Sequence, residues 1–438
     1  MNVLVIGSGA REHAIAWSIL KDPRVQKLYL APGNGGAREL GAIAERAPIK
    51  ATDIDALLAF AKTKRIDLTV VGPEQPLELG VVNRFQAEGL NIIGPTKEAA
   101  RLETSKAFAK AFMRRHRIPT AAFETFANHD EAKAFVERQT KFPIVVKASG
   151  LAAGKGVVIA TSKSDALEAL RAMFEQRLFG DAGSEVVIEE FLQGEEASVF
   201  VITDGEHYKL LPTAQDHKRI GEGDTGKNTG GMGAYSPAPI VTPDVMRNIE
   251  RHIIQPTLRA MREEGTPYRG FLYVGLMICE GEPKVVEFNA RLGDPEAQVV
   301  LPLLETSLLE ILLATLDGRL RELEVKIADK CAATVVMASK GYPDQCETGK
   351  LITGQCHFEL ACYAGARDDV MIFHAGTTFE NGKLYSNGGR VLSVTAVASS
   401  LEECLARCYD AISQIHFEGA YYRRDIGWRA LRNLQTQR

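Results

Sequence analysis

The sequence predicts a multidomain α/β protein that begins with a doubly wound parallel-sheet domain and ends with an α+β domain. Residues 1–95 alternate short apolar runs with amphipathic stretches, which is the pattern of consecutive βαβ units. After residue 120 several apolar runs follow one another with only a turn between them, which indicates antiparallel strands. The chain has 438 residues, 45% of them hydrophobic, so its length predicts two to four domains.

Charge and cysteine content exclude several classes of function. The net charge is −4 and no long run of Lys or Arg occurs, so we expect neither a nucleic-acid nor a membrane partner. The longest apolar runs fall short of a membrane span, and the start "MNVLVIGSGA" lacks the features of a signal peptide. Seven cysteines occur without CxxC pairs, so we expect reduced thiols, including Cys404 and Cys408 as packing residues, and a cytoplasmic location.

The first domain is expected to contain strands at "NVLVIG", "KLYLAP", "DLTVVG" and "NIIGP", separated by helices over 11–20, 53–64 and 81–89. Glycines follow these strands at "GSGA", "PGNGG", "GPE" and "GPT". Ligands bind at the carboxyl ends of parallel strands, so we expect a substrate surface there.

The stretch "GSGARE" (7–12) tests whether that ligand is a dinucleotide. Glu12 stands where the dinucleotide fingerprint GxGxxG needs its third glycine, and no acidic residue ends the second strand. NAD binding is therefore disfavoured. A tight strand–helix turn and a helix N-terminus that binds a small phosphate or sugar beside Arg11 both fit, and we favour the second.

The rest of the chain predicts a different pattern. Thr96 caps a helix that continues through "KEAARLETSKAFAKAFMRRHRI" to a stop near Pro119. We then expect strands at "FETF", "PIVVKAS", "VVIAT", "EVVIEEFL" and "ASVFVITDG", with helices near 129–139 and 164–175. A long polar, glycine-rich loop (216–239), a helix over 243–264, a hairpin over 270–293, helices over 295–317 and an α+β unit from about 330 complete the prediction.

The stretch "KASGLAAGKG" (147–156) resembles a P-loop but does not match it, because Ser149 stands where the first glycine should be and Gly156 replaces the hydroxyl. The residues that follow, "VVIAT", are β-branched, so the loop joins two strands. A glycine-rich hairpin can bind phosphates through free N–H groups. A flexible hairpin tip explains the glycines equally well, but not the flanking Lys147 and Lys155.

Two further stretches favour the interpretation that this hairpin binds phosphates. In "VVEFNARLGDPE" (285–296), Glu287, Asn289 and Arg291 share one face of a strand, with the first two roughly 7 Å apart. A carboxylate and an amide oxygen suit Mg²⁺, and an arginine fork suits a phosphate or carboxylate. In "VIEEFLQGEE" (187–196), the strand end offers backbone groups to an adenine edge and Glu196 to a ribose. A solvated strand face remains the alternative for the first stretch.

A glycine-rich hairpin with lysines, an "EEFL…E" connector and a distal "EFNAR" strand, in this order, resemble the ATP-grasp fold. Stretches such as "VIGSGAREHA", "APGNGG", "GLAAGKG", "NTGGMGAYSPAP", "EFNAR", "FHAGT" and "DIGWRA" look like those of the glycinamide ribonucleotide synthetase family, and they span Val5 to Ala430. The resemblance implies an N-terminal domain over 1–103, an ATP-grasp domain over 104–328 with a lid near 122–193, and a C-terminal domain over 329–438.

The resemblance also implies a reaction and its residues. ATP and Mg²⁺ or Mn²⁺ would activate glycine as glycyl phosphate, which the amine of 5-phosphoribosylamine attacks, in a monomer or weak homodimer. ATP contacts would come from Lys106, Lys147, Gly150, Gly154, Lys155, Gly156, Glu189, Glu190, Phe191, Leu192 and Glu196. Metal ligands would be Glu287 and Asn289, catalytic residues Arg291, Asp216 and Lys218, and the phosphoribosylamine surface Gly9, Arg11, Gly33, Asn34, Gly72, Pro73 and Glu74.

Ser149 and Ala10 depart from the family pattern, where Asp and Gly are usual, and both are small. Two other functions are compatible with parts of the sequence. A different ATP-grasp ligase or carboxylase would use another acid or amine, but "NTGGMGAY" looks specific to the glycine ligases. A non-catalytic nucleotide-binding module would have no metal site, and the "EFNAR" face argues against it.

Overall fold

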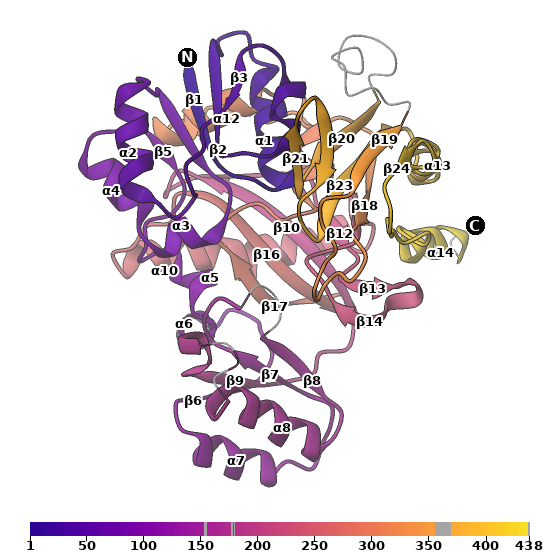
Figure 1. Ribbon diagram of the computed structural model, residues 1–438. Coiled ribbons are helices and arrows are strands. Elements are labelled where there is room, and N and C mark those ends of the chain that lie inside the picture. Colours follow the sequence, from indigo (N-terminus) through magenta and orange to yellow (C-terminus); the bar gives the residue numbers. More distant parts are fainter. Residues whose placement is uncertain (153–155, 177, 179, 355–368, 437–438) are drawn as a thin grey trace.

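The structure is a computed structural model that describes residues 1–152, 156–176, 178, 180–354 and 369–436. It has a large body and a smaller lobe, which carries α7 (His129–Glu137) and α8 (Lys163–Phe174) at the bottom of Figure 1. Within the described ranges, no helix is long and apolar enough to cross a membrane.

The N-terminal sheet is parallel throughout, with the order β3-β2-β1-β4-β5, as the βαβ pattern predicts. Its strands are β1 (Asn2–Gly7), β2 (Lys27–Pro32), β3 (Ala44–Arg46), β4 (Leu68–Val71) and β5 (Ile92–Ile93). The helices are α1 (Ala10–Leu20), η1 (Gly35–Leu40), α2 (Ile54–Thr63), α3 (Glu74–Glu78) and α4 (Val81–Ala87). The sequence does not predict β3, because its three residues are too few to show an alternation of apolar and polar side chains.

The prediction of a single helix after Thr96 is wrong. Ser105 interrupts the helical segment and divides it into α5 (Arg101–Thr104) and α6 (Lys106–Arg115). Ser105 has extended backbone angles and its hydroxyl accepts a hydrogen bond from the Phe108 N–H, so it is the N-cap of a new helix. The break directs the Lys106 N–H to the Ser149 carbonyl, 2.8 Å away. It thereby attaches the start of α6 to the glycine-rich hairpin.

The lobe is a four-stranded antiparallel sheet of order β6-β9-β7-β8 with α7 and α8 on one face. The strands are β6 (Phe123–Phe126), β7 (Ile144–Ala148), β8 (Val157–Ala160) and β9 (Val186–Glu190), and the 3₁₀ turn η2 spans Gly180–Gly183. Its core consists only of residues from within the lobe, among them Val136, Val146, Leu170 and Ile188. The lobe therefore has a hydrophobic core separate from that of the body.

The central sheet is antiparallel, with the order β11-β10-β16-β17. Its strands are β10 (Glu195–Thr203), β11 (Tyr208–Leu210), β16 (Gly270–Cys279) and β17 (Glu282–Asn289), and the last two form the predicted hairpin. The register of that hairpin shifts between the pairs Gly275–Glu287 and Leu276–Val285, so Val286 is an extra residue on β17. The bulge lies immediately before Glu287. Helical segments α9 (Pro243–Ile249), η4 (Glu250–Ile254) and α10 (Gln255–Glu263) precede this hairpin as predicted.

The glycine-rich stretch 216–239 is not the continuous loop that its composition predicts. It contains the last residue of β12 (Gln215–Asp216), the hairpin β13 (Arg219–Gly221) and β14 (Thr225–Asn228) around η3 (Glu222–Asp224), and β15 (Gly233–Ser236). β12 and β15 join the C-terminal strands in one sheet of order β12-β15-β18-β23-β20. A short strand in a glycine-rich segment is stabilised by its tertiary partners, which a local pattern does not reveal.

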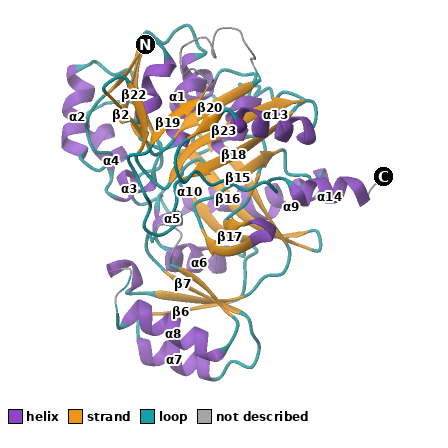
Figure 2. Ribbon diagram, turned by 45° about the vertical axis from the view of Figure 1, so that its right-hand side comes forward, coloured by secondary structure: helices purple, strands orange, loops and turns teal. Residues whose placement is uncertain are grey.

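The C-terminal part is α+β, as predicted. Its strands in the shared sheet are β18 (Cys331–Ala338), β20 (Val370–His374) and β23 (Arg390–Ala398), and Figure 2 shows β23 between β18 and β20. A second sheet, of order β21-β22-β19-β24, comprises β19 (Leu351–Gly354), β21 (Thr377–Glu380), β22 (Lys383–Ser386) and β24 (Ile415–His416). The helices of this part are α13 (Leu401–Ser413) and α14 (Trp428–Thr436), and the segments α11 (Ala297–Val300), η5 (Leu301–Leu303) and α12 (Leu308–Leu316) precede it.

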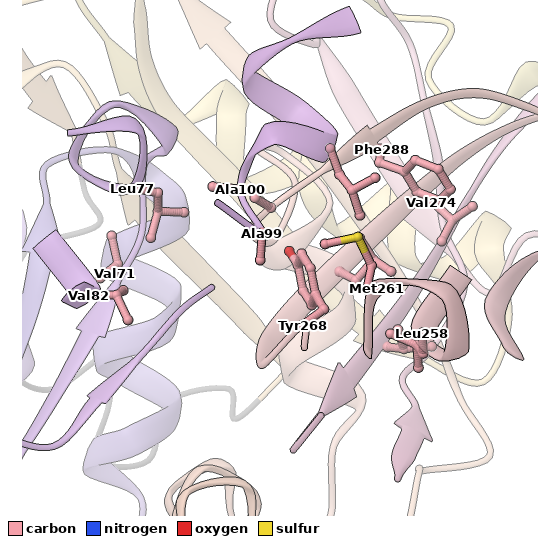
Figure 3. Close-up of a cluster of buried hydrophobic side chains, with 14 of the residues drawn as sticks. Val71, Leu77, Val82, Ala99, Ala100, Leu258, Met261, Tyr268, Val274 and Phe288 are labelled. Atoms are coloured by element: carbon pink, nitrogen blue, oxygen red, sulfur yellow. The ribbon is translucent and has the colours of Figure 1, made fainter. Parts of the chain in front are cut away.

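Two hydrophobic cores cross between parts of the chain that are far apart in the sequence. In the first, Leu77 and Val82 of the N-terminal domain belong to the same cluster as Met261 of α10 and Phe288 of β17 (Figure 3). The second, which we call the shared core, unites Val5 of β1, Phe200 of β10, Leu309 of α12 and Phe373 of β20. The body is thus built on cores that no single segment completes.

Candidate active site

A cavity of about 600 Å³ lies where the lobe, the central sheet, the N-terminal domain and the C-terminal strands meet. The predicted site residues that line it are Arg11, Glu74, Lys106, Lys147, Gly156, Glu189, Glu190, Phe191, Leu192, Glu196, Asp216, Lys218, Glu287, Asn289 and Arg291. These come from widely separated parts of the sequence, so the fold brings most of the predicted site together.

Other predicted residues lie outside the cavity lining. Gly150 N–H donates to the Ala182 carbonyl, and its own carbonyl accepts from the Lys106 ammonium at 3.1 Å. Gly9, Gly33, Asn34, Gly72 and Pro73 belong to the turns of the N-terminal sheet and are not part of the cavity lining. Gly154 and Lys155 fall outside the described residues.

One end of the cavity is an apolar slot beside the connector after β9. Val145 and Ile159 of the lobe and Met277 of β16 contribute its apolar walls, and Phe191 and Leu192 follow the end of β9. Connector residues have free backbone groups at a strand end, so the slot offers apolar walls together with donors and acceptors for an adenine edge.

Next to the slot, a buried cluster of opposite charges joins the lobe to α6. The Glu189 carboxylate forms ion pairs with both Lys147 of β7 and Lys110 of α6. All three residues are at most 5% exposed. Burial opposes ionisation of Glu189, but the two lysines lower its pKa. Lys147 is thereby held in place with its ammonium in the cavity wall.

Glu287 and Asn289 fit the requirements of a divalent metal site. Burial raises the pKa of Glu287, but Lys218, Lys147 and Lys106 outweigh it and hold that pKa below its usual value. Among the described residues, no hydrogen bond or ion pair uses either side chain. The described part of the chain contains no cluster of three or more metal-binding side chains, so water and nucleotide oxygens would complete the coordination, as Mg²⁺ prefers.

The Arg291 guanidinium, just after β17, is held by carboxylates from two other elements. Its Nε lies 3.3 Å from Glu74, and its Nη2 lies 2.9 Å from Glu103. Its Nη1 donates to the Leu292 carbonyl at 3.3 Å. The sequence predicts that this fork faces a substrate anion, whereas here it also links the end of β17 to α3 and α5.

Asp216 and Lys218 flank His217 at the start of the glycine-rich segment. The Lys218 ammonium forms an ion pair with Glu196 of β10. Burial raises the pKa of Asp216 to about 7, although Lys218 opposes the shift. A carboxyl group with such a pKa exchanges protons near neutral pH, which suits the catalytic role predicted for it.

Glu12 explains the glycines of the N-terminal turns. Its carboxylate accepts a hydrogen bond from the Gly9 N–H at 2.6 Å and pairs with Arg11 at the same distance. A side chain at Gly72 would place its Cβ 2.1 Å from the Glu12 Oε1, and Gly7 has a similar constraint. Glu12 thus occupies the space that a dinucleotide pyrophosphate would need.

Asn34 connects these turns to the C-terminal domain. Its amide nitrogen donates to the Ser8 carbonyl at 2.9 Å and to the His374 carbonyl at 2.7 Å. Its side-chain oxygen accepts from the Gly36 N–H. His374 N–H donates in turn to the Nδ1 of His13, and of the five residues in this network all but Ser8 are buried. This network, the His13–His374 junction, fixes the turn after β2 against the turn after β1.

The His13–His374 junction makes the protein sensitive to acid. Burial, and then His374, lower the pKa of His13 well below its usual value, and its Nδ1 must stay unprotonated to accept its hydrogen bond. Below about pH 6.5 the unfolded chain binds a proton at His13 that the folded chain does not, so stability falls with falling pH.

We expect the free energy of unfolding to fall between pH 7.5 and 5.5 by about 1 kcal/mol more in the wild type than in a His13→Asn variant. Asparagine keeps an acceptor near the Nδ1 position and does not titrate. Denaturant unfolding at a series of pH values measures both proteins, and parallel curves would exclude His13 as the source of acid sensitivity.

Several cavity residues were missed by the sequence analysis. Lys110 lies one helical turn after Lys106 on α6, a spacing that places both on one face and was available as a signal. Glu103, Glu296, Asp294, Arg390 and Arg429 also line the cavity. Nothing in their local sequence indicates that they meet, because their positions depend on tertiary contacts.

Three family models match the chain in order. They are the N domain of phosphoribosylglycinamide synthetase over residues 1–103, its ATP-grasp (A) domain over 104–297 and its C domain over 332–429. The chain belongs to the phosphoribosylglycinamide synthetase family. It is therefore an ATP-grasp enzyme of the carboxylate–amine ligase type, with the ATP use and divalent metal that this fold implies.

Individual members of the phosphoribosylglycinamide synthetase family match over their whole length. The phosphoribosylamine–glycine ligase of Chlorobaculum tepidum is 59% identical over 98% of this chain and 100% of its own. The phosphoribosylamine–glycine ligase of Ralstonia nicotianae is 50% identical over 99% of this chain and 100% of its own. The crystal structure of phosphoribosylamine–glycine ligase from Thermotoga maritima matches with 35% sequence identity and a TM-score of 0.83. The match covers 97% of this chain and 100% of that chain.

The fold extends beyond the phosphoribosylglycinamide synthetase family. A biotin carboxylase–β,γ-ATP complex from Campylobacter jejuni matches with a TM-score of 0.73 over 97% of this chain and 93% of that chain. Its sequence identity is 16%, so this similarity concerns the fold alone.

Proposed function

We propose that the enzyme ligates glycine to 5-phosphoribosylamine through glycyl phosphate, giving glycinamide ribonucleotide, ADP and phosphate, in purine biosynthesis. The observation that carries this proposal is the end-to-end match to a ligase of this name at 59% identity. The cavity supports it, because its lining combines apolar residues, lysines and metal-type ligands with Arg11 and Glu74 of the N-terminal domain.

The reaction divides into two displacements. A glycine carboxylate oxygen attacks the γ-phosphorus of ATP and the bond to the bridging oxygen breaks, releasing ADP. The amine of phosphoribosylamine then attacks the carbonyl carbon of glycyl phosphate, and phosphate leaves with the electrons of the C–O bond. Such chemistry needs positioning and charge neutralisation rather than an enzyme nucleophile.

The residues divide accordingly. Lys106 and Lys147 would neutralise ATP phosphates, and the Glu190–Leu192 connector would hold adenine. Mg²⁺ or Mn²⁺, held by Glu287 and Asn289, would supply charge stabilisation to the transferred phosphoryl group. The amine loses a proton in the second step, and Asp216 is the candidate acceptor because its pKa is about 7. We further propose a cytoplasmic monomer or weak homodimer with domains over 1–103, 104–328 and 329–438.

ADP release tests the proposal. With ATP, Mg²⁺, glycine and freshly prepared phosphoribosylamine, we expect ADP formation that depends on both glycine and the amine. Parallel reactions replace glycine by bicarbonate, or Mg²⁺ by Mn²⁺. ADP formation that is independent of the amine, or that bicarbonate supports equally well, would contradict the assignment and favour another ATP-grasp activity.

A further inference from the structure

Arg390, the first residue of β23, brings a cation from the C-terminal domain into the cavity. Its Nη1 donates to the Gly230 carbonyl at 2.6 Å and to the Asp294 carbonyl at 2.7 Å, and forms an ion pair with the Asp294 carboxylate at 3.2 Å. The guanidinium is thus anchored at one nitrogen by the glycine-rich segment and by the turn after β17.

The opposite edge of the same guanidinium is open. Among the described residues, no hydrogen bond or ion pair uses the Nε or Nη2 of Arg390. Its side chain is 21% exposed and lines the cavity. The Nε–Nη2 pair forms the fork that binds two oxygens of one phosphate or carboxylate.

The glycine-rich segment is shaped around this side chain. A Cβ at Gly230 would lie 2.9 Å from the Arg390 Cζ and at 3.1 and 3.3 Å from Nη2 and Nε. These similar distances place the flat face of the guanidinium against the Gly230 backbone. The contact fixes the plane of the fork while leaving its edge free.

Arg390 is anchored on different elements from Lys106 and Lys147, the two lysines expected to contact the ATP phosphates. The Lys106 ammonium donates to the Gly150 carbonyl and Lys147 pairs with Glu189, both in the lobe, whereas Arg390 is held by Gly230 and Asp294. Asp294 also reaches the turn after β1, since a Cβ at Gly9 would lie 3.1 Å from its Oδ2. Arg390 therefore belongs to the neighbourhood of the N-terminal turns.

The position of Arg390 near the N-terminal turns indicates which substrate group it would bind. The ATP phosphates would bind at Lys106 and Lys147, and the glycine carboxylate must meet the γ-phosphate there. The remaining anionic group among the substrates is the phosphomonoester of phosphoribosylamine. We propose that the open edge of Arg390 binds this phosphomonoester, so that the C-terminal domain supplies part of the sugar-phosphate site; this inference rests on the proposed function.

Ribose 5-phosphate is a stable probe of this site, and calorimetry can measure its binding to the wild type and to Arg390→Ala and Arg390→Lys variants. We expect both variants to lose about 10- to 100-fold in affinity, because a bidentate charged contact is removed. In steady-state kinetics the KM for phosphoribosylamine should rise by a similar factor, with the KM values for ATP and glycine unchanged. Methylguanidinium should partly restore the Arg390→Ala variant.

Arg424→Ala is a matched control, because Arg424 is an exposed arginine of the same domain outside the cavity lining. Unchanged ribose 5-phosphate affinity in both Arg390 variants would overturn the inference. An equal rise of all three KM values would also overturn it, since it would indicate a purely structural role. If instead the wild type neither binds the probe nor needs phosphoribosylamine for ADP release, the proposed function itself fails.

Discussion

Replacing Glu287 by glutamine is expected to lower kcat about 10²- to 10³-fold while ATP still binds, because a neutral amide is a weak metal ligand. The variant has almost the same size, so the close contact with Gly275, where a Cβ would lie 3.2 Å from the Glu287 Cγ, is preserved. ADP release at saturating Mg²⁺ measures the loss, and raising Mg²⁺ or substituting Mn²⁺ should restore only part of it.

Glu282→Gln is the control for this experiment. Glu282 begins the same strand, is exposed and lies outside the cavity lining, so its replacement should leave kcat unchanged. Activity near that of the wild type in Glu287→Gln would remove Glu287 from the metal site. A loss of folded protein, checked by thermal unfolding, would instead point to a packing role.

Replacing Glu189 by glutamine is expected to lower the free energy of unfolding by about 3–5 kcal/mol, because two buried lysines lose their shared counter-ion. Lys110 and Lys147 are at most 5% exposed, so water cannot replace the carboxylate without opening the lobe. Burial already lowers the pKa of Lys110, so the variant should release a proton from one lysine as it folds. Denaturant unfolding measures the loss of stability.

The control for Glu189 is Glu124→Gln on the neighbouring strand β6. Glu124 forms an exposed ion pair with Arg114 at 3.5 Å, which contributes about 0–1 kcal/mol. Adding Lys110→Met to Glu189→Gln should recover part of the stability, because one unpaired charge is removed. Equal stability of Glu189→Gln and Glu124→Gln would show that the buried cluster contributes little.

Much of the fold could be predicted because its signals are local. The parallel order of the first sheet follows from βαβ alternation, and the β16–β17 hairpin follows from two apolar runs around "EGEP". The break at Ser105 and the strand β15 could not be predicted in this way. The break at Ser105 is accompanied by a hydrogen bond from the Lys106 N–H to the distant Ser149, and β15 pairs with the distant β18.

The site residues, too, could be predicted only where their signals are local. Glu287, Asn289, Lys106 and Lys147 were accessible because spacing and residue type suggest their chemistry, and the structure brings them to one cavity. Arg291 was predicted to meet a phosphate or carboxylate of a substrate, and its ion pairs with Glu74 and Glu103 could not be predicted, since these carboxylates come from distant elements. Arg390 was missed because an arginine at a strand start gives no local indication of what it faces.

The shared core bears on how the chain folds during synthesis. Residues of β1 emerge from the ribosome first, but the cluster that covers them includes Leu309 and Phe373, which are made much later. The lobe differs, because its own cluster is complete once residue 188 has been made. The second segment to be synthesised is therefore the first able to close a core of its own, while the N-terminal sheet waits for nearly the whole chain.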